Sequence, residues 1–152
     1  MEVFLKTEAK RLNAVIRDIH QCSNHLRMRT NEIHQDLNGI NASMRSVMEI
    51  LSYARPITVP EIGRVKGVSR QHIQLVVNTL LEMSLIKRQD NPDDKRTYLV
   101  SLTSVGKDTY DAIQLREMTE LQTLCDEFDS EELRVATKMM QKLNKLVTKG
   151  FN

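Results

Sequence analysis

The sequence predicts a mainly α-helical fold with one small β-hairpin, in which a helix-turn-helix and the hairpin are flanked by long helical segments. Apolar residues recur at helical spacing along most of the chain. Strand-like alternation is confined to residues 85–102, around a cluster of turn formers. The 152 residues are 40% hydrophobic and 28% charged, which suits one domain covering residues 1–152. Because only 4% of them are aromatic, we expect an aliphatic core with methionines filling gaps.

Residues 3–37 are predicted to form one long amphipathic helix. Its apolar face is formed by Leu12, Val15, Ile16, Ile19, Cys22 and Leu26. The turn-forming pair Asn38-Gly39 ends the helix. Since Cys22 belongs to the apolar face, we expect its thiol to be buried and inert.

Two short helices are expected next. Asn41 is a suitable N-cap for the first, and Arg55-Pro56 ends it because the residue before proline is disfavoured in a helix. Thr58 and Glu61 have the spacing of a capping box for the second, in which Pro60 is tolerated in the first turn.

A tight turn at Gly67 joins this helix to a third, which is the arrangement of a helix-turn-helix. The second helix is expected to reach about Lys66, with Ile62 and Val65 directed inward. Ser69 is a suitable N-cap for the third helix. Its apolar stripe at i, i+3, i+4 and i+7 consists of Ile73, Val76, Val77 and Leu80.

Residues 85–89 and 97–102 are expected to be the strands of a hairpin, joined by the turn formers at 91–94. The whole chain has a net charge of only +2. Residues 64–98 carry seven Lys/Arg against four Asp/Glu, an excess of three positive charges. A modestly basic middle segment suits a surface that faces phosphates.

Two helices are expected to complete the chain. Thr103 is the N-cap of one that runs to about Glu127. Asp129 and Glu132 have the spacing of a capping box for the last helix. The apolar residues of that helix are Leu133, Ala136, Met140, Leu143 and Val147.

The third helix carries hydrogen-bonding side chains beside its apolar stripe. In a helix-turn-helix the second helix of the pair enters the major groove of DNA, and its N-terminal residues reach the base edges. Arg suits guanine, Gln suits adenine and Ser suits phosphate. The candidate DNA-binding residues of this helix are Ser69, Arg70, Gln71, His72, Gln74 and Asn78. The alternative to a DNA-binding face is an ordinary solvent-exposed helix face, which more often carries Glu and Lys.

Several segments resemble the signature of the MarR family of winged helix-turn-helix regulators. They are Gly39-Ile40-Asn41, Gly67-Val68-Ser69-Arg70-Gln71, Leu85-Ile86-Lys87-Arg88, Asn91-Pro92-Asp93-Asp94-Lys95-Arg96 and Leu99-Val100-Ser101-Leu102-Thr103. The Asp-x-Arg element of the hairpin, Asp94 and Arg96, is the most specific of these. The resemblance is close over about residues 39–106, and the flanking helices match by pattern only.

The resemblance implies a homodimer with a winged DNA-binding lobe at 41–102 and dimerisation helices at 3–37 and 104–149. The hairpin would be the wing and reach the minor groove beside the recognition helix. Arg96 matches the wing arginine of the family and Asp94 its partner acid, while Lys95 is the expected phosphate contact.

The function implied is a sequence-specific DNA-binding transcriptional regulator, a repressor on a pseudo-palindromic operator in double-stranded DNA that a small aromatic or lipophilic effector releases. Three positions depart from the family pattern. Leu75 and Thr79 stand where the recognition helix often has Arg, and Ser84 stands where Gly usually ends that helix. Leu75, Thr79 and the low net charge leave open a second interpretation, a winged-helix module that docks protein and has lost DNA binding.

Other chemistry finds little support. His20, His25 and His34 fall on different sides of a helix, so we expect no metal site. Some relatives sense peroxides, but the expected burial of Cys22 argues against redox sensing with Cys125. Met28, Met44, Met48 and Met118 suit a core better than a ligand pocket.

No phosphate loop, nucleophile elbow or metal-ligand spacing is present, so we expect neither an enzyme nor a cofactor. Two distant cysteines suit a reducing compartment, and neither a signal peptide nor a membrane-spanning run is apparent. We therefore expect a cytoplasmic protein that makes no use of a membrane.

Overall fold

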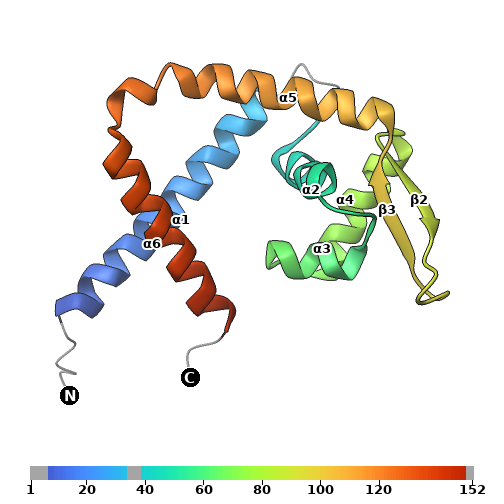
Figure 1. Cartoon of the computed structure of the whole chain (residues 1–152), viewed down its shortest axis with the longest axis horizontal. Helices are drawn as coiled ribbons and strands as arrows, with labels where there is room; N and C mark the ends of the chain where they lie inside the picture. Colours follow the sequence, from blue (N-terminus) through green and yellow to red (C-terminus); the bar gives the residue numbers. More distant parts are fainter. Residues whose placement is uncertain (1–6, 34–38, 150–152) are drawn as a thin grey trace. The chain divides into compact units, whose positions relative to one another are not determined.

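A computed structural model describes residues 7–33 and 39–149 of the chain (Figure 1). The chain divides after Gln114 into two compact units. The first holds a long N-terminal helix, a lobe of helices with a small sheet, and the start of α5 (Ser104–Gln122). The second holds the rest of α5, a short 3-10 turn and α6 (Ser130–Thr148).

The N-terminal helix α1 spans Thr7–Ile33. Residues 3–6 and 34–37, which the sequence also assigned to this helix, lie outside the described residues. The expectation that Cys22 is buried is wrong, because its side chain is exposed. The predicted apolar stripe is only partly covered, because Val15, Ile16 and Ile19 are half-buried whereas Leu12 and Leu26 are exposed like Cys22. Amphipathic spacing identifies an apolar face without identifying what packs on it.

Helices α2, α3 and α4 begin at the predicted caps. Asn41 accepts a hydrogen bond from the backbone of Met44 at the start of α2, which spans Ala42–Tyr53. Thr58 and Glu61 form the capping box of α3, which spans Val59–Lys66. Ser69 accepts from the backbone of His72 at the start of α4, which spans Arg70–Glu82. Each cap satisfies backbone donors that a helix start leaves unpaired.

The sheet has three antiparallel strands in the order β1-β3-β2, not the two that the sequence predicted. The hairpin strands β2 (Ile86–Asp90) and β3 (Tyr98–Leu102) pair with Ile86 opposite Leu102 and Asp90 opposite Tyr98. The additional strand β1 is only Ile57–Thr58, paired with Val100 and Leu99. Two residues are too short to show alternation, so this strand exists only through its tertiary pairing.

The core of the lobe is aliphatic, as predicted. It contains the predicted stripe of α4, with Val77 and Leu80 fully buried, packed with Met48, Ile62 and Val100. The prediction that Val65 points inward is wrong, since its side chain is 61% exposed. Helix α3 has only eight residues, and its buried face is completed by Gly63 instead. A Cβ on Gly63 would lie 3.1 Å from the carbonyl oxygen of Val68, so the turn packs directly on the helix.

Two turns end α3 and α4 in the left-handed region. Gly67 has φ of +64° and closes the helix-turn-helix. Ser84 has φ of +58° at the end of α4, where its N–H donates to the Leu81 carbonyl and the N–H of Leu85 donates to that of Leu80. This pair of bonds is a Schellman motif, built here on a serine at the position that glycine usually fills.

Helix α5 (Ser104–Gln122) starts against this turn. Thr103 accepts from the backbone of Gly106 at 2.9 Å and donates to the carbonyl of Ser84 at 2.8 Å. A Cβ on Gly106 would lie 1.8 Å from the Leu85 carbonyl oxygen, so no larger residue fits without movement. The end of α4, the start of β2 and the start of α5 thus meet at one tightly packed point.

The predicted end of α5 near Glu127 is wrong, because the helix stops at Gln122 and a 3-10 turn, η1, follows at Cys125–Glu127. The backbone N–H groups of Thr123 and Leu124 donate to carbonyls three residues earlier rather than four. The hydroxyl of Thr123 donates to the same Glu120 carbonyl as its backbone N–H. Such side-chain competition favours the tighter turn. The last helix, α6 (Ser130–Thr148), begins at the predicted capping box of Asp129 and Glu132. No helix within the described residues is long and apolar enough to cross a membrane.

Candidate nucleic-acid interface

The start of α4 presents polar side chains to solvent. Arg70, Gln71 and His72 are exposed there, while Ile73 and the stripe that follows it are buried. The first turn has no acidic residue. The dipole at the start of a helix favours a negatively charged partner such as phosphate. The exposure of these three side chains agrees with the sequence, and their contact with DNA stays a prediction.

Further along α4 the two remaining candidates differ. Asn78 is exposed, as predicted, but Gln74 is half-buried and turned toward the sheet. The Nε2 of Gln74 donates to the hydroxyl of Tyr98 on β3 at 2.8 Å and to Oδ1 of Asn78 at 2.9 Å. The sequence placed Gln74 off the apolar stripe without indicating that a strand 24 residues later lies beside it.

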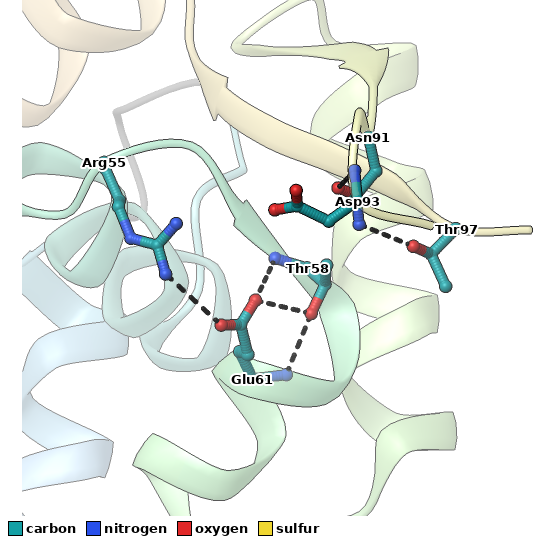
Figure 2. A network of polar contacts seen from close by, with 6 residues as sticks. All are labelled: Arg55, Thr58, Glu61, Asn91, Asp93 and Thr97. Atoms are coloured by element: carbon teal, nitrogen blue, oxygen red, sulfur yellow. Dashed lines mark hydrogen bonds and ion pairs between the residues drawn. The ribbon is translucent and has the colours of Figure 1, made fainter. Parts of the chain in front are cut away.

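The turn of the hairpin, the candidate wing tip, is organised by short polar bonds. Asn91 is buried, donates from Nδ2 to the hydroxyl of Thr97 at 2.8 Å and accepts from the backbone of Asp93 at 3.0 Å (Figure 2). The carbonyl of Asp94 accepts from the backbone and from the hydroxyl of Thr97. These bonds tie the two ends of the turn together, which limits the conformations of residues 91–97.

Within this turn the predicted pair of Asp94 and Arg96 is present. Oδ1 of Asp94 accepts from the backbone and from Nε of Arg96, at 3.0 and 3.2 Å. The Arg96 side chain is nevertheless 91% exposed, and Lys95 beside it is exposed as well. The guanidinium is therefore held at its base and presented to solvent.

A second set of polar contacts lies at the start of α3. Glu61 accepts from the backbone and hydroxyl of Thr58 at 2.9 and 2.7 Å, and Arg55 lies 3.9 Å from its other oxygen (Figure 2). The two bonds from Thr58, together with the charges of Arg55 and Arg64, hold the pKa of Glu61 below its ordinary value. The carboxylate thus stays ionised while it caps α3.

Arg88 and Tyr98 were not among the candidate DNA-binding residues. The guanidinium of Arg88 on β2 lies 4.7 Å from the centre of the Tyr98 ring, which is cation–π geometry. Asp90 is the residue directly opposite Tyr98, so Arg88 is its diagonal neighbour across the ladder. The contact could have been found from the sequence only after fixing the register of the hairpin.

The charge of this part of the lobe is presented to solvent. All seven cations between residues 64 and 98 are exposed: Arg64, Lys66, Arg70, Lys87, Arg88, Lys95 and Arg96. Lys66 also donates to the hydroxyl of Ser46 on α2. The positive excess inferred from the sequence is therefore available to an anionic partner.

Other predicted or excluded sites lie elsewhere. His20 and His25 are exposed on α1, and His34 lies outside the described residues. Among residues 7–33 and 39–149 no group of three or more His, Cys, Asp or Glu side chains is placed to hold a metal ion. Cys22 and Cys125 are both exposed and are not joined in a disulfide.

Comparison with known proteins agrees with this geometry. A model of the MarR family matches residues 40–98, the part of the chain that holds the helix-turn-helix and most of the hairpin. The HTH-type transcriptional regulator PapX of Escherichia coli is 30% identical over 107 residues, which cover 69% of this chain and 65% of PapX. An uncharacterized protein of Mycobacterium tuberculosis is 27% identical over 129 residues, covering 85% of this chain and 89% of its own length.

Among solved structures, a MarR mutant from Escherichia coli complexed with operator DNA superposes with a TM-score of 0.76 at 25% identity. The match covers 88% of this chain and 95% of that one. The predicted fold class, mainly α with a hairpin wing, is therefore confirmed.

Proposed function

The chain belongs to the MarR family of transcription regulators, and we propose that it is a homodimeric repressor that binds a pseudo-palindromic operator in double-stranded DNA. The observation that best supports this is the exposed first turn of α4, which presents Arg70 and Gln71, together with a hairpin whose exposed Arg96 is held by Asp94. In proteins of this architecture the recognition helix reads the major groove and the neighbouring element contacts the backbone or minor groove.

Each contact has an expected role. Arg70 and Gln71 reach base edges, Ser69 and Lys95 contact phosphate, and Arg96 enters the minor groove or contacts the backbone. His72 and Asn78 complete the exposed face of α4. Asp94 organises the wing by holding Arg96.

Selection of binding sites from a random duplex pool tests this function. A symmetric dimer with two recognition helices selects an inverted repeat whose half-sites lie about one helical turn, 10–10.5 bp, apart. Recovery of no inverted repeat, or of unrelated sequences only, would contradict the proposal.

Dimerisation is supported by exposed apolar side chains within each unit. On α1 they are Leu12, Leu26 and Met28; on α6 they are Leu133, Val135, Met139, Leu146 and Val147. Helices with several large apolar side chains exposed normally pack them against another element. Sedimentation equilibrium should give twice the 17.6 kDa of one chain, and the mass of a monomer at micromolar concentration would contradict the dimer.

Release by a small aromatic or lipophilic effector is the last part of the proposal, and it rests on the analogy with the family. A ligand that binds the DNA-free conformation better must weaken operator binding by the ratio of its two affinities. A thermal-shift screen of aromatic acids and lipophilic cations, followed by operator titration with each hit, tests it. No hit that also lowers operator affinity would contradict it.

A second function, a protein-docking module without DNA binding, is favoured by one observation. Three exposed apolar side chains, Val65, Val68 and Leu75, lie along the helix-turn-helix, and Leu75 is 68% exposed on α4 itself. Salt separates the two functions, because duplex binding through phosphates weakens steeply as salt rises. Duplex affinity that falls between 50 and 200 mM salt supports the regulator; absence of duplex binding at both supports the docking module.

A further inference from the structure

Three side chains from three elements form a continuous contact between the recognition helix and the wing. Gln74 of α4 donates to the hydroxyl of Tyr98 on β3 at 2.8 Å. The ring of Tyr98 lies 4.7 Å from the guanidinium of Arg88 on β2. We call this set the Gln74–Tyr98–Arg88 bridge. It crosses from the N-terminal half of α4 to both strands of the hairpin.

Gln74 has no free amide hydrogen in this arrangement. A glutamine amide carries two N–H donors, and here one goes to Tyr98 and the other to Oδ1 of Asn78. Reading adenine takes a donor to N7 and an acceptor for the N6 amino group at once. Gln74 would have to give up Tyr98 or Asn78 to supply that donor. Its bonds therefore suit a fixed role inside the lobe.

The bridge lies where it can restrain the angle between α4 and the hairpin. Chain continuity joins α4 to β2 only through the turn at Ser84, at the far end of the helix. Gln74 lies near the N-terminal end of α4, close to the turn that carries Arg70. A contact there restrains the angle between helix and hairpin more strongly than one beside the turn.

We propose that Gln74 is a positioning residue, which through Tyr98 and Arg88 sets the wing at a fixed angle to α4 so that both reach adjacent grooves of one duplex together. This rests on the proposed DNA-binding function. It assigns to Gln74 a role other than the base contact expected from its place on the helix. It also makes Tyr98 and Arg88, neither of which was among the candidate DNA-binding residues, part of the binding apparatus.

Removal of the hydroxyl of Tyr98 is the sharpest test, since Tyr98→Phe keeps the ring for Arg88 and for the core. We expect Gln74→Ala and Tyr98→Phe each to weaken operator binding about fivefold, the weight of one neutral hydrogen bond. The double variant should bind no worse than either single one, because both remove the same bond. Base preference at every operator position should stay as in the wild type. Tyr53→Phe, at an exposed tyrosine of α2, is the matched control and should bind like the wild type.

A double-mutant cycle between Tyr98 and Arg96 tests whether the bridge acts on the wing tip. If the bridge presents the wing, Arg96→Ala should cost less affinity in the Tyr98→Phe background than in the wild type. Hydroxyl-radical footprints of Tyr98→Phe should lose protection in the minor groove under the wing and keep it beside the major groove. Binding is measured well below the melting temperature of each variant, so that loss of fold does not mimic loss of contact.

The outcomes separate this inference from the proposed function. If wild type binds no duplex specifically, the regulator function itself fails and the inference falls with it. If wild type binds but Tyr98→Phe is indistinguishable from it, the bridge does not position the wing and only the inference is overturned. If Gln74→Ala relaxes the preference at one base pair while Tyr98→Phe has no effect, Gln74 reads that base, which also overturns the inference.

Discussion

Asp94 holds Arg96 at two points, accepting on one carboxylate oxygen from its backbone N–H at 3.0 Å and from its Nε at 3.2 Å. The Asp94 side chain is 37% exposed and that of Arg96 is 91% exposed. A surface ion pair of this kind contributes little to stability. Its consequence is conformational, because it fixes the base of a side chain whose far end remains available to DNA.

Substitutions of Arg96 and Asp94 should therefore change DNA affinity and its salt dependence in different ways. Arg96→Ala removes a charge that faces DNA, so it should weaken all duplexes alike and reduce the salt slope by about one unit per site. Asp94→Asn removes no DNA contact, yet it should weaken binding while leaving the salt slope nearly unchanged. Asp93→Asn, at the neighbouring acid, is the control. Titrations at several salt concentrations measure both quantities, and an Asp94→Asn protein that binds as tightly as the wild type would show that the pair does not organise the wing.

Arg70 should behave as a base-reading residue. If it contacts guanine, Arg70→Ala should cost roughly 1–3 kcal/mol of binding free energy and relax the preference at one position of each half-site. Lys87→Ala, which removes an exposed cation from β2, should leave base preference unchanged. Affinity for a set of single-base operator variants measures this. Unchanged affinity and preference in Arg70→Ala would make Arg70 an ordinary solvated residue.

Ser84 is expected to be a site of strain. A non-glycine residue in the left-handed region destabilises the folded state by about 1–2 kcal/mol. A glycine there avoids this strain, but its greater backbone freedom stabilises the unfolded chain by roughly 0.5–1 kcal/mol. The difference favours Ser84→Gly, which should stabilise the lobe by about 0.5 kcal/mol. The bond that Thr103 makes to the Ser84 carbonyl survives the change.

Gly67 provides the matched reverse change, since it has φ of +64° and open space where a Cβ would lie. By the same balance with the opposite sign, Gly67→Ala should destabilise the lobe by about 0.5 kcal/mol. Urea unfolding of both variants measures the two values. A Ser84→Gly protein less stable than the wild type would mean that the Ser84 side chain contributes more than its backbone costs.

Glu61 should make the stability of the lobe depend on pH. Its pKa is held below the ordinary 4.5, chiefly by the hydrogen bond from the Thr58 hydroxyl. A group with a lowered pKa in the folded state adds stability above its unfolded pKa and loses it as the pH falls through the folded value. The stability difference between the wild type and Glu61→Gln should therefore be full at pH 7 and shrink steadily below pH 4.5. Glu82→Gln, at an exposed glutamate of α4, is the control. A stability difference between the wild type and Glu61→Gln that stays constant down to pH 3 would contradict the prediction.

The local signals in the sequence predicted most of the helix starts. Caps at Asn41, Thr58, Ser69 and Asp129 mark four helix starts because a capping side chain acts within one turn of the backbone. Strand β1 and the end of α5 were not predicted correctly. The first depends on pairing with a strand about forty residues away, and the second on a competition for carbonyls that propensity does not rank.

The same distinction holds for the candidate site. The exposed positions of Arg70, Gln71 and Arg96 follow from helical spacing and turn chemistry, so they were predictable. The turning of Gln74 toward Tyr98 depends on where the hairpin packs. The exposure of Cys22 depends on which neighbours cover α1. A periodic pattern cannot supply either, because it describes one element at a time.

Leu75 offers a gain-of-function test that separates DNA binding from protein docking. Its side chain is 68% exposed on α4, at a position where MarR relatives often carry arginine. If α4 enters the major groove, Leu75→Arg should add a phosphate contact, tighten binding to all duplexes and steepen the salt slope by about one unit per site. Leu75→Gln, which is polar but uncharged, is the control and should leave the slope unchanged. If Leu75 belongs instead to a protein-docking face, neither variant should gain duplex affinity. Titration of a non-specific duplex at several salt concentrations is the measurement, because a new phosphate contact strengthens binding regardless of sequence.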